Sequence, residues 1–400
     1  MKIAGRAILK AGRDGPVRGG NPWIFSQAIA RLEPPAMRAG DLVEVDDSTG
    51  LAIGLAHYNP ATTIALRMLA FDSAIEPGDL IVRRLARAFE LRNRVVIGET
   101  NCYRLLNGDG DGLSGVIIDR YGDAVVVQLL TAGADRMRGE LVAALSDLIA
   151  PRTIIERSQG AVRRQEGLED RTGVLAGEPI AVAQVVEGGI RLAVDLEHGQ
   201  KTGGFLDQRG NRATIREIAR GARMLDAYCY SGGFALAAIA GGARQVAGVD
   251  SSERAIAAAR RNLDLNGYPA DRAEFVHGDA ARYLAAAATE RPAGERFDLI
   301  VVDPPPLARS LKDAVNAGRL YIDLNALAMR ALAPGGRLMT FSCSSHFGGE
   351  DFMRAVRIAQ IKAGRKLRTI GRLGPGPDHP VLLGHAEGEY LTGVLLADLG

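Results

Sequence analysis

The chain has 400 residues, of which 47% are hydrophobic and 24% are charged, so it can bury more than one core and has the composition of a globular protein. No apolar run reaches the roughly 18 residues of a membrane span, and residues 1–6 lack the apolar core of a secretory signal, which predicts a cytoplasmic protein without a membrane partner. The formal net charge of +2 is too small to indicate nucleic-acid binding by itself.

Residues 1–72 predict a small β barrel. The apolar segments at 40–45, 50–55 and 62–68 are short and are broken by Gly, Asp and Pro, as in strands joined by tight turns. Small barrels are built from such strands, so a separate N-terminal domain is expected.

Basic side chains are concentrated at the start of this domain. Residues 1–31 contain six basic side chains and one acid, a modest electrostatic attraction for a nucleic acid. The only tryptophan of the chain lies among them, and it either offers a stacking surface for a base or closes a small core. The candidate RNA contacts of this domain are Lys10, Arg13, Arg18 and Trp23.

Residues 73–190 predict a second domain of the α+β class. Apolar positions at helical spacing indicate a helix over 79–96, and a second helix is expected over 138–149. The runs at 116–119 and 124–127 indicate two strands around a turn.

No metal site is expected. Residues 108–112 alternate Gly and Asp and could form a calcium loop, but the carboxylate that such a loop needs further along is missing at the right spacing, so a plain turn is favoured. The three cysteines, at positions 102, 229 and 343, cannot all pair within one chain and show no close metal spacing. We therefore expect reduced thiols.

From residue 191 to residue 400, predicted strands and helices alternate strictly. This alternation predicts a parallel sheet with right-handed crossovers. Ser251 or Ser252 can cap the helix after the second strand, and Gly267 can end it. The expected strands are 223–227, 245–249, 273–276, 298–302, 336–341 and a last one at 390–396.

Carboxylates accompany three consecutive strands of this sheet. In an open α/β sheet, ligands bind beyond the carboxyl ends of the strands, so Asp226, Asp250 and Asp279 should face one site. Asp250 is placed to hold a ribose diol, and Asp279 could accept a hydrogen bond from an adenine amino group. Glycines in the turn after the first strand let a ligand approach the backbone. The candidate residues of that turn are Tyr228, Ser231, Gly232, Gly233 and Phe234.

Two nucleoside-containing cofactors suit this site. A dinucleotide needs a G-x-G-x-x-G turn that places its pyrophosphate at a helix N-terminus, and the chain offers only Gly232 and Gly233. S-adenosyl-L-methionine has no phosphate and carries a sulfonium, which suits acids and aromatic rings such as Asp226 and Tyr228. The methyl donor is therefore favoured.

A carboxylate and a thiol follow two later strands. Asp303 ends one apolar run and Cys343 ends the next, so both should lie in one pocket. A thiol is a strong nucleophile, and a nearby carboxylate can hold a proton on a ring under attack. A buried structural cysteine is the alternative. Cys229 is a rival nucleophile, and His346 is either a proton carrier or a loop side chain.

Seven motifs, in register along nearly the whole chain, resemble the ribosomal RNA large-subunit methyltransferase I family, a group of cytosine carbon-5 methyltransferases. The resemblance implies an N-terminal PUA-like RNA-binding barrel, a central α+β domain and a C-terminal Rossmann-like class I methyltransferase domain with a seven-stranded, mostly parallel sheet. The motifs are Pro22 to Ser26, Gly108 to Gly115 with Asp119 to Gly122, Gln200 to Arg209, Tyr230 to Phe234, Asp303 to Pro305, Phe341 to Ser344 and Asp378 to Pro380.

The resemblance also implies roles for single residues. Cys343 stands where the family carries its nucleophile, and Asp303 stands in a methyl-donor motif, from which it would also hold the cytosine edge. The segment before the catalytic domain adds Phe205 and Gln208 as cofactor contacts and Lys201 and Arg209 as RNA contacts. The implied partner is large-subunit ribosomal RNA, anchored further by Arg163 and Arg164, and homodimer formation is left open.

One departure from the family pattern is visible. The residue after Asp303, Pro304 and Pro305 is commonly Lys in the family and is Pro306 here, which puts a cation at this position in doubt. A related group that methylates guanine nitrogen 7 has Asn where Cys343 stands, so the thiol favours cytosine. The alternatives are methylation of another ribosomal RNA base, a nicotinamide oxidoreductase, and a non-catalytic RNA-binding protein with a relic methyltransferase domain.

Overall fold

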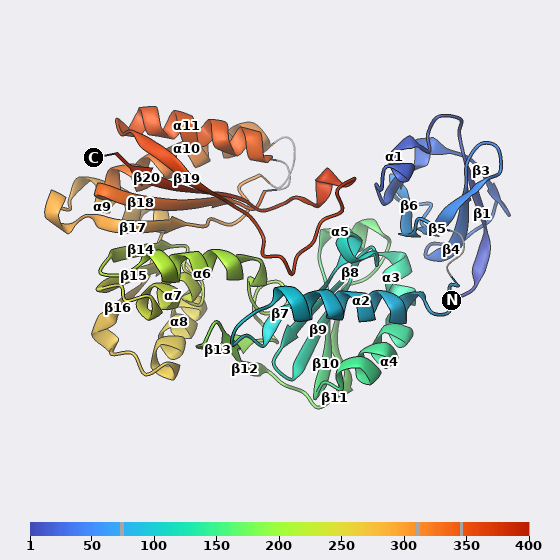
Figure 1. Ribbon diagram of the computed structural model, residues 1–400, viewed down its shortest axis with the longest axis horizontal. Coiled ribbons are helices and arrows are strands. Elements are labelled where there is room, and N and C mark those ends of the chain that lie inside the picture. The colour runs from blue at the N-terminus through green and yellow to red at the C-terminus, as the bar shows by residue number, and fades with distance from the viewer. Residues whose placement is uncertain (73–75, 309–312, 345–346, 400) are drawn as a thin grey trace. The chain divides into compact units, whose positions relative to one another are not determined.

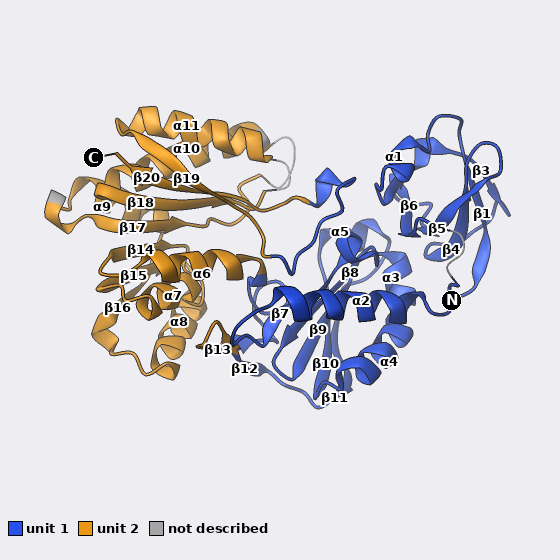
Figure 2. Ribbon diagram, in the orientation of Figure 1, with its two compact units in different colours: residues 1–185, 194–206, 377–388 blue, residues 186–193, 207–376, 389–400 orange. Residues whose placement is uncertain are grey.

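The strands form four sheets within residues 1–72, 76–308, 313–344 and 347–399, which the structure, a computed structural model, describes (Figure 1). The chain divides into two compact units (Figure 2). Unit 1 comprises residues 1–185, 194–206 and 377–388, and unit 2 comprises residues 186–193, 207–376 and 389–400. The three domains with boundaries at residues 72 and 190 stay a prediction.

The N-terminal part of unit 1 is a six-stranded sheet. The strands pair in the order β2 (Trp23–Phe25), β6 (Ile64–Ala70), β5 (Ala52–Tyr58), β4 (Asp41–Asp46), β1 (Ile3–Leu9) and β3 (Ile29–Glu33). Strands β4, β5 and β6 confirm the three predicted strands, whereas β1, β2 and β3 were not predicted. The pairing of the described strands leaves β2 and β3 as edges, so closure into a barrel stays a prediction. The connections include α1 (Gly15–Arg18) and η1 (Ser26–Ala28).

A five-stranded sheet forms the rest of the core of unit 1. The strands pair in the order β11 (Arg171–Gly177), β10 (Thr153–Ser158), β9 (Ala124–Leu129), β8 (Val116–Tyr121) and β7 (Cys102–Asn107). Helices α2 (Leu80–Val95) and α4 (Arg138–Ile149) bury their apolar faces against it, as predicted. The glycine- and aspartate-rich segment is a tight turn, η2 (Gly108–Asp111). The remaining elements of this region are α3 (Ala132–Arg136) and α5 (Ala161–Gln165). The hairpin of β12 (Val182–Glu187) and β13 (Ile190–Asp195) belongs to both units, because residues 186–193 are part of unit 2.

Unit 2 is built on a seven-stranded mixed sheet. The strands pair in the order β16 (Ala273–His277), β15 (Gln245–Asp250), β14 (Arg223–Ala227), β17 (Phe297–Val302), β18 (Leu332–Ser342), β20 (Thr392–Asp398) and β19 (Leu367–Leu373). The first five run parallel, and β20 is antiparallel to both of its neighbours. All six predicted strands are confirmed. Strand β19 was not predicted because four of its seven residues are exposed and three of those four are polar, so it has no apolar run.

Helices cover both faces of this sheet, and each face has its own buried core (Figure 1). One layer consists of α9 (Ala280–Thr289), α10 (Ala314–Ala331) and α11 (Gly349–Ala363), and the other of α6 (Arg209–Ile218), α7 (Gly233–Ala240) and α8 (Glu253–Leu265). The Oγ of Ser252 accepts a hydrogen bond from the amide of Ala255 at 3.2 Å, so Ser252 is the cap of α8. The short turns are η3 (Leu206–Gln208), η4 (Ala270–Arg272), η5 (Ala293–Glu295) and η7 (Ala386–Gly388). None of the helices in the described ranges combines the length and apolar character of a membrane span.

Candidate active site

The strand order of unit 2 reverses between β14 and β17. The chain leaves β14 toward α7 on one face and leaves β17 toward α10 on the other, and doubly wound sheets bind their ligands beyond the carboxyl ends of two such strands. Asp226 lies in β14, and Asp303 directly follows β17. The reversal therefore places two of the predicted acids at the position where doubly wound sheets bind their ligands.

Asp226 is a fully buried carboxylate at this position. Its Oδ2 accepts a hydrogen bond from the amide of Ala235 at 3.0 Å, while its Oδ1 is buried and has no hydrogen-bond partner in the described residues. Burial, and then the charges of Asp303 and Asp250, raises the pKa of Asp226 to about 7. Carboxylates that repel one another in a buried place are stabilised by a cation, so this position suits a positively charged ligand.

The turn after β14 is shaped around Asp250. The amides of Tyr230 and Ser252 donate to its two carboxylate oxygens, both at 2.9 Å. Tyr230 has a φ of 47° and Gly232 a φ of 81°, so the backbone turns left-handed there. A Cβ on Gly232 would lie 3.1 Å from the Cβ of Ala259, which makes glycine the residue that fits. The backbone of this turn is thus held close to the carboxylate that was predicted to bind a ribose.

The other predicted cofactor residues fall into two groups. Burial, followed by the charges of Asp279 and Asp250, raises the pKa of Tyr228 to about 12. Asp279 also caps α9 by accepting a hydrogen bond from the amide of Arg282 at 2.8 Å. Phe234 is different, because its ring packs on Phe341 in the core with ring centroids 6.0 Å apart, which leaves only its backbone for a ligand.

Ser231 and Gly233 stay in the same turn. The carbonyl of Ser231 accepts a hydrogen bond from Asn262 Nδ2 at 3.1 Å, and Asn262 Oδ1 accepts one from the amide of Ala193 at 2.8 Å. Asn262 was missed at the sequence level, since it lies ten residues into a helix whose spacing marks only its apolar face. Gly233 begins α7.

Asp303 is oriented by Gln208. The Nε2 of Gln208 donates to Asp303 Oδ2 at 3.0 Å, and the Oε1 of Gln208 accepts from Asn211 Nδ2 at 2.6 Å. Both amide side chains are buried. Gln208, which was predicted as a cofactor contact, thus contacts Asp303. Asn211 was missed, although its spacing of three residues from Gln208 is a usable signal.

Cys343 lies beside the segment that follows Asp303. Val302 of β17 pairs with Thr340 of β18, so the chain after both strands emerges at the same edge of the sheet. The half-buried Cys343 Sγ donates to the carbonyl oxygen of Pro304 at 3.5 Å. The structure therefore brings the predicted thiol and carboxylate to one place. His346 lies outside the described residues.

Cys229 is the less suitable thiol. Its side chain is buried, and burial followed by the charges of Asp226 and Asp250 raises its pKa well above the ordinary value. A thiolate is the nucleophilic form, and negative neighbours disfavour it.

The predicted RNA contacts of unit 1 have different surroundings. Lys10 and Arg13 are exposed. Arg18 pairs with Asp14 at 2.6 Å and with Asp47 at 2.8 Å. Trp23 donates from its indole nitrogen to Asp109 Oδ2 at 3.2 Å, and its ring packs edge-on to that of His385 with centroids 4.4 Å apart, an arrangement typical of a structural tryptophan.

Four further basic residues were predicted outside the N-terminal domain. One of them, Arg164, is exposed and pairs with Asp170 at 3.0 Å. Lys201 is exposed, and its ammonium lies 4.7 Å from the ring centroid of Phe205, both within unit 1. Arg209 is the first residue of α6 in unit 2. The prediction for Arg163 is wrong, because its guanidinium is buried and pairs with Asp135 at 2.7 Å.

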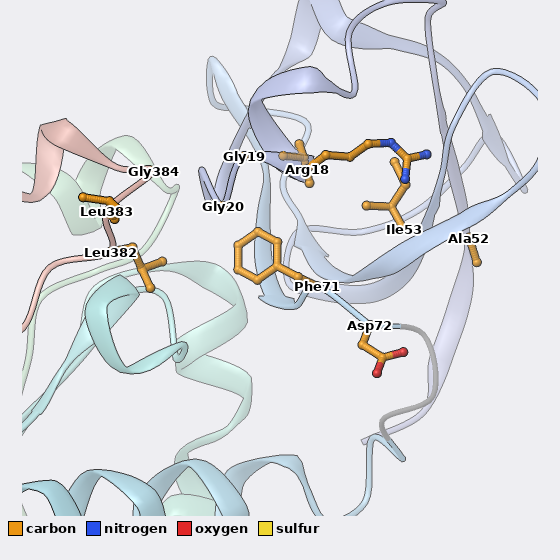
Figure 3. A pocket seen from close by; sticks show the side chains of 11 residues that line it. Arg18, Gly19, Gly20, Ala52, Ile53, Phe71, Asp72, Leu382, Leu383 and Gly384 are labelled. Atoms are coloured by element: carbon orange, nitrogen blue, oxygen red, sulfur yellow. The ribbon is translucent and has the colours of Figure 1, made fainter.

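Unit 1 also contains a pocket, shown in Figure 3. Its lining combines apolar side chains with backbone, and Arg18 is the one basic residue among the described lining residues. Because Arg18 is already paired with two acids, the pocket offers a polyanion little attraction. The lining consists of Val17, Arg18, Gly19, Gly20, Ala52, Ile53, Phe71, Asp72, Leu382, Leu383 and Gly384.

Comparison with known families and proteins gives consistent matches. A family model of S-adenosylmethionine-dependent methyltransferases matches residues 148–387, and a model of PUA-like domains matches residues 7–71. The chain is 41% identical over 388 residues to ribosomal RNA large subunit methyltransferase I of Photobacterium profundum, covering 96% of this chain and 97% of that protein. It is 40% identical over 392 residues to the protein of the same name from Escherichia coli strain SMS-3-5, covering 97% and 98%.

Solved structures share the fold. A candidate SAM-dependent methyltransferase from Streptococcus mutans matches with a TM-score of 0.82 at 21% identity, over 99% of this chain and 100% of that chain. A candidate methyltransferase solved as a complex with SAH matches with a TM-score of 0.83 over the same shares. The chain thus shares its fold with these two structures over nearly its whole length.

Proposed function

The chain belongs to the ribosomal RNA large subunit methyltransferase I family and is a SAM-dependent methyltransferase, and from this premise we propose that it methylates carbon 5 of a cytosine in large-subunit ribosomal RNA. The observation that carries the proposal is the thiol of Cys343 beside the segment that begins at Asp303. Methylation of a nitrogen needs no such nucleophile, whereas carbon 5 of cytosine does.

Cys343 would start the reaction. Carbon 5 of cytosine is a poor nucleophile until a thiolate adds to carbon 6, which places the electron pair of the ring double bond on an enamine that ends at carbon 5. Asp303 would hold the edge of the base and favour a proton on the ring nitrogen, which stabilises the adduct. S-adenosylmethionine supplies the electrophilic methyl group that carbon 5 takes. A base or water then removes the proton from carbon 5, the carbon–sulfur bond breaks, and the thiolate is restored.

The neighbouring residues prepare this chemistry. Gln208 donates to one oxygen of Asp303 and so helps to orient this carboxylate for the base. The hydrogen bond from Cys343 to Pro304 requires the S–H form, so this bond breaks when the thiolate forms. Asp226 would hold the sulfonium of the methyl donor, and Asp250 would hold its ribose.

The proposal is tested with RNA that carries 5-fluorocytosine at the target position. Fluorine cannot leave as a proton does, so the adduct stays covalent. We expect a SAM-dependent protein–RNA adduct, seen as a band shift in denaturing gels, with the native chain and with Cys229→Ala, and none with Cys343→Ala. An adduct that persists in Cys343→Ala would place the nucleophile elsewhere.

The target RNA is identified in cells. Ribosomal RNA from a strain that lacks the protein should lose one 5-methylcytosine from the large subunit, measured by mass spectrometry of nuclease digests. Loss of a methylguanine instead would contradict the choice of base, and loss of neither would contradict the choice of RNA.

A further inference from the structure

The segment after Asp303 has an unusual backbone. Pro304, Pro305 and Pro306 have no N–H groups, so Leu307 and Ala308 carry the first two amides that can donate. Both amides donate to a single atom, the Oγ of Ser344, at 3.1 Å and 3.2 Å. The proline segment is therefore attached to the residue that follows Cys343.

Tyr321 of α10 completes this network. Its hydroxyl lies 3.1 Å from the Oγ of Ser344 and 3.0 Å from the Oγ of Ser342. Since two amides occupy the lone pairs of Ser344 Oγ, the proton of that hydroxyl is directed to Tyr321. Burial raises the pKa of Tyr321, so the phenol stays neutral at physiological pH.

The ring of Tyr321 is fixed independently of its hydroxyl. It is fully buried, stacks on Phe347 at a centroid distance of 5.1 Å and meets Phe352 edge-on at 5.4 Å. Removal of the hydroxyl alone therefore leaves the packing of α10 in place.

We propose that the hydroxyl bracket of Tyr321, Ser342 and Ser344 positions the thiol of Cys343 relative to Asp303, with Tyr321 as the residue on which both serines converge. Cys343 lies between the two serines, so its backbone is held on both sides. The same bracket holds the far end of the proline segment, whose near end meets the thiol at Pro304. The inference rests on the proposed role of Cys343, and Tyr321 acts through that residue without touching the substrate.

The variant Tyr321→Phe tests the bracket. A misplacement of the thiol by about 1 Å can cost on the order of 100-fold in rate, so we expect kcat to fall roughly 10- to 100-fold. KM for RNA and the Kd for S-adenosylmethionine should change less than about twofold, because Tyr321 contacts neither site. The matched control is Tyr283→Phe in α9, whose hydroxyl accepts a hydrogen bond from Arg291 at 3.2 Å.

A second readout does not depend on methyl transfer. The rate at which iodoacetamide alkylates Cys343 in the free protein, followed by peptide mass spectrometry, should rise in Tyr321→Phe because the thiol is no longer held at Pro304. Ser344→Ala should give the same change, and the double variant should show little beyond either single variant, since both remove one network.

The outcomes separate the two proposals. If the native chain forms no adduct with fluorocytosine RNA but Tyr321→Phe changes the alkylation rate, the chemistry fails and the bracket stands. If alkylation and kcat in Tyr321→Phe equal those of the native chain, the bracket is overturned. It is also overturned if the effects of Tyr321→Phe and Ser344→Ala add fully, or if Tyr321→Phe weakens cofactor binding and kcat by the same factor.

Discussion

The carboxyl group of Asp226 is held where its charge is costly. Its pKa of about 7 lies above the value of 3.8 for an unfolded chain, with burial as the main cause. A raised folded-state pKa means that the native state binds protons more tightly than the unfolded state. This contribution to stability is complete below about pH 4 and is lost as the pH rises through 7.

This loss of stability with rising pH predicts how the variant Asp226→Asn should behave. The difference in melting temperature between the variant and the native chain should grow in favour of the variant from pH 5 to pH 8, because asparagine cannot ionise. Each unit of pKa shift corresponds to about 1.4 kcal/mol. Over this pH range, the free energy of unfolding of the native chain should therefore fall, relative to that of the variant, by an amount on the order of a few kcal/mol. Asp279→Asn, at the exposed position before α9, is the control for replacing a carboxylate by an amide. A melting difference for Asp226→Asn that stays constant with pH would contradict the assignment.

At this scale, the strand pattern predicted the acids of the site, whereas the polar helix residues Asn211, Asn262 and Tyr321 were missed. Asp250 and Asp303 follow buried runs, so the pattern of the strand identifies them. Tyr321 acts through two serines at the end of β18, and helical spacing cannot distinguish it from any other buried ring. Asn211 acts through Gln208, three residues before it, and also donates to the carbonyl of Gly374. Their roles became visible only with the distances.

Helix α2 contributes an ion pair that tests the difference between buried and exposed charges. Arg92 is fully buried and bonds both oxygens of Asp111, at 2.6 Å and 2.7 Å. On the same helix, the exposed Arg94 pairs with Glu90. Both arginines belong to this helix, and the two ion pairs differ in burial.

We expect Arg92→Met to lower the free energy of unfolding by about 3–5 kcal/mol, because Asp111 is left as a buried charge without its partner. Arg94→Met should change it by about 0.5 kcal/mol or less. Urea unfolding at constant pH measures both. Similar losses of unfolding free energy in the two variants would show that burial does not control how much these ion pairs contribute to stability.

Elements were predictable in proportion to how continuous their apolar pattern is. Strand β17 is buried along nearly all of its length and was predicted within one residue. Strand β1 buries only its last three side chains, and β19 buries none fully, so neither has the pattern of a strand. Tertiary pairing, which a single sequence does not reveal, forms these two strands.

The salt dependence of RNA binding depends on how many basic side chains of the molecule contact phosphates. The logarithm of the binding constant falls as the logarithm of the salt concentration rises. Each basic side chain that neutralises a phosphate makes this slope more negative by about one. Lys10 and Arg13 are exposed, whereas Arg18 is already bonded to Asp14 and Asp47. The three residues are neighbours in sequence but differ in how much charge they offer.

We therefore expect Lys10→Ala and Arg13→Ala to reduce the salt slope of RNA binding by about one each, and the matched variant Arg18→Ala to leave it nearly unchanged. Fluorescence anisotropy with large-subunit RNA fragments at several salt concentrations measures the slope. Equal effects of all three substitutions would contradict the distinction.

The division of unit 1 into three chain segments has a consequence for how the protein is made. Arg92 donates to the carbonyl of Asp378 at 2.7 Å, and the amide of Arg104 donates to its carboxylate at 3.1 Å. These bonds join positions that leave the ribosome at very different times, since residues 207–376 are synthesised between them. Part of the buried polar network of unit 1 must therefore stay open until residues 207–376 have been translated, although the folding of unit 1 can begin first.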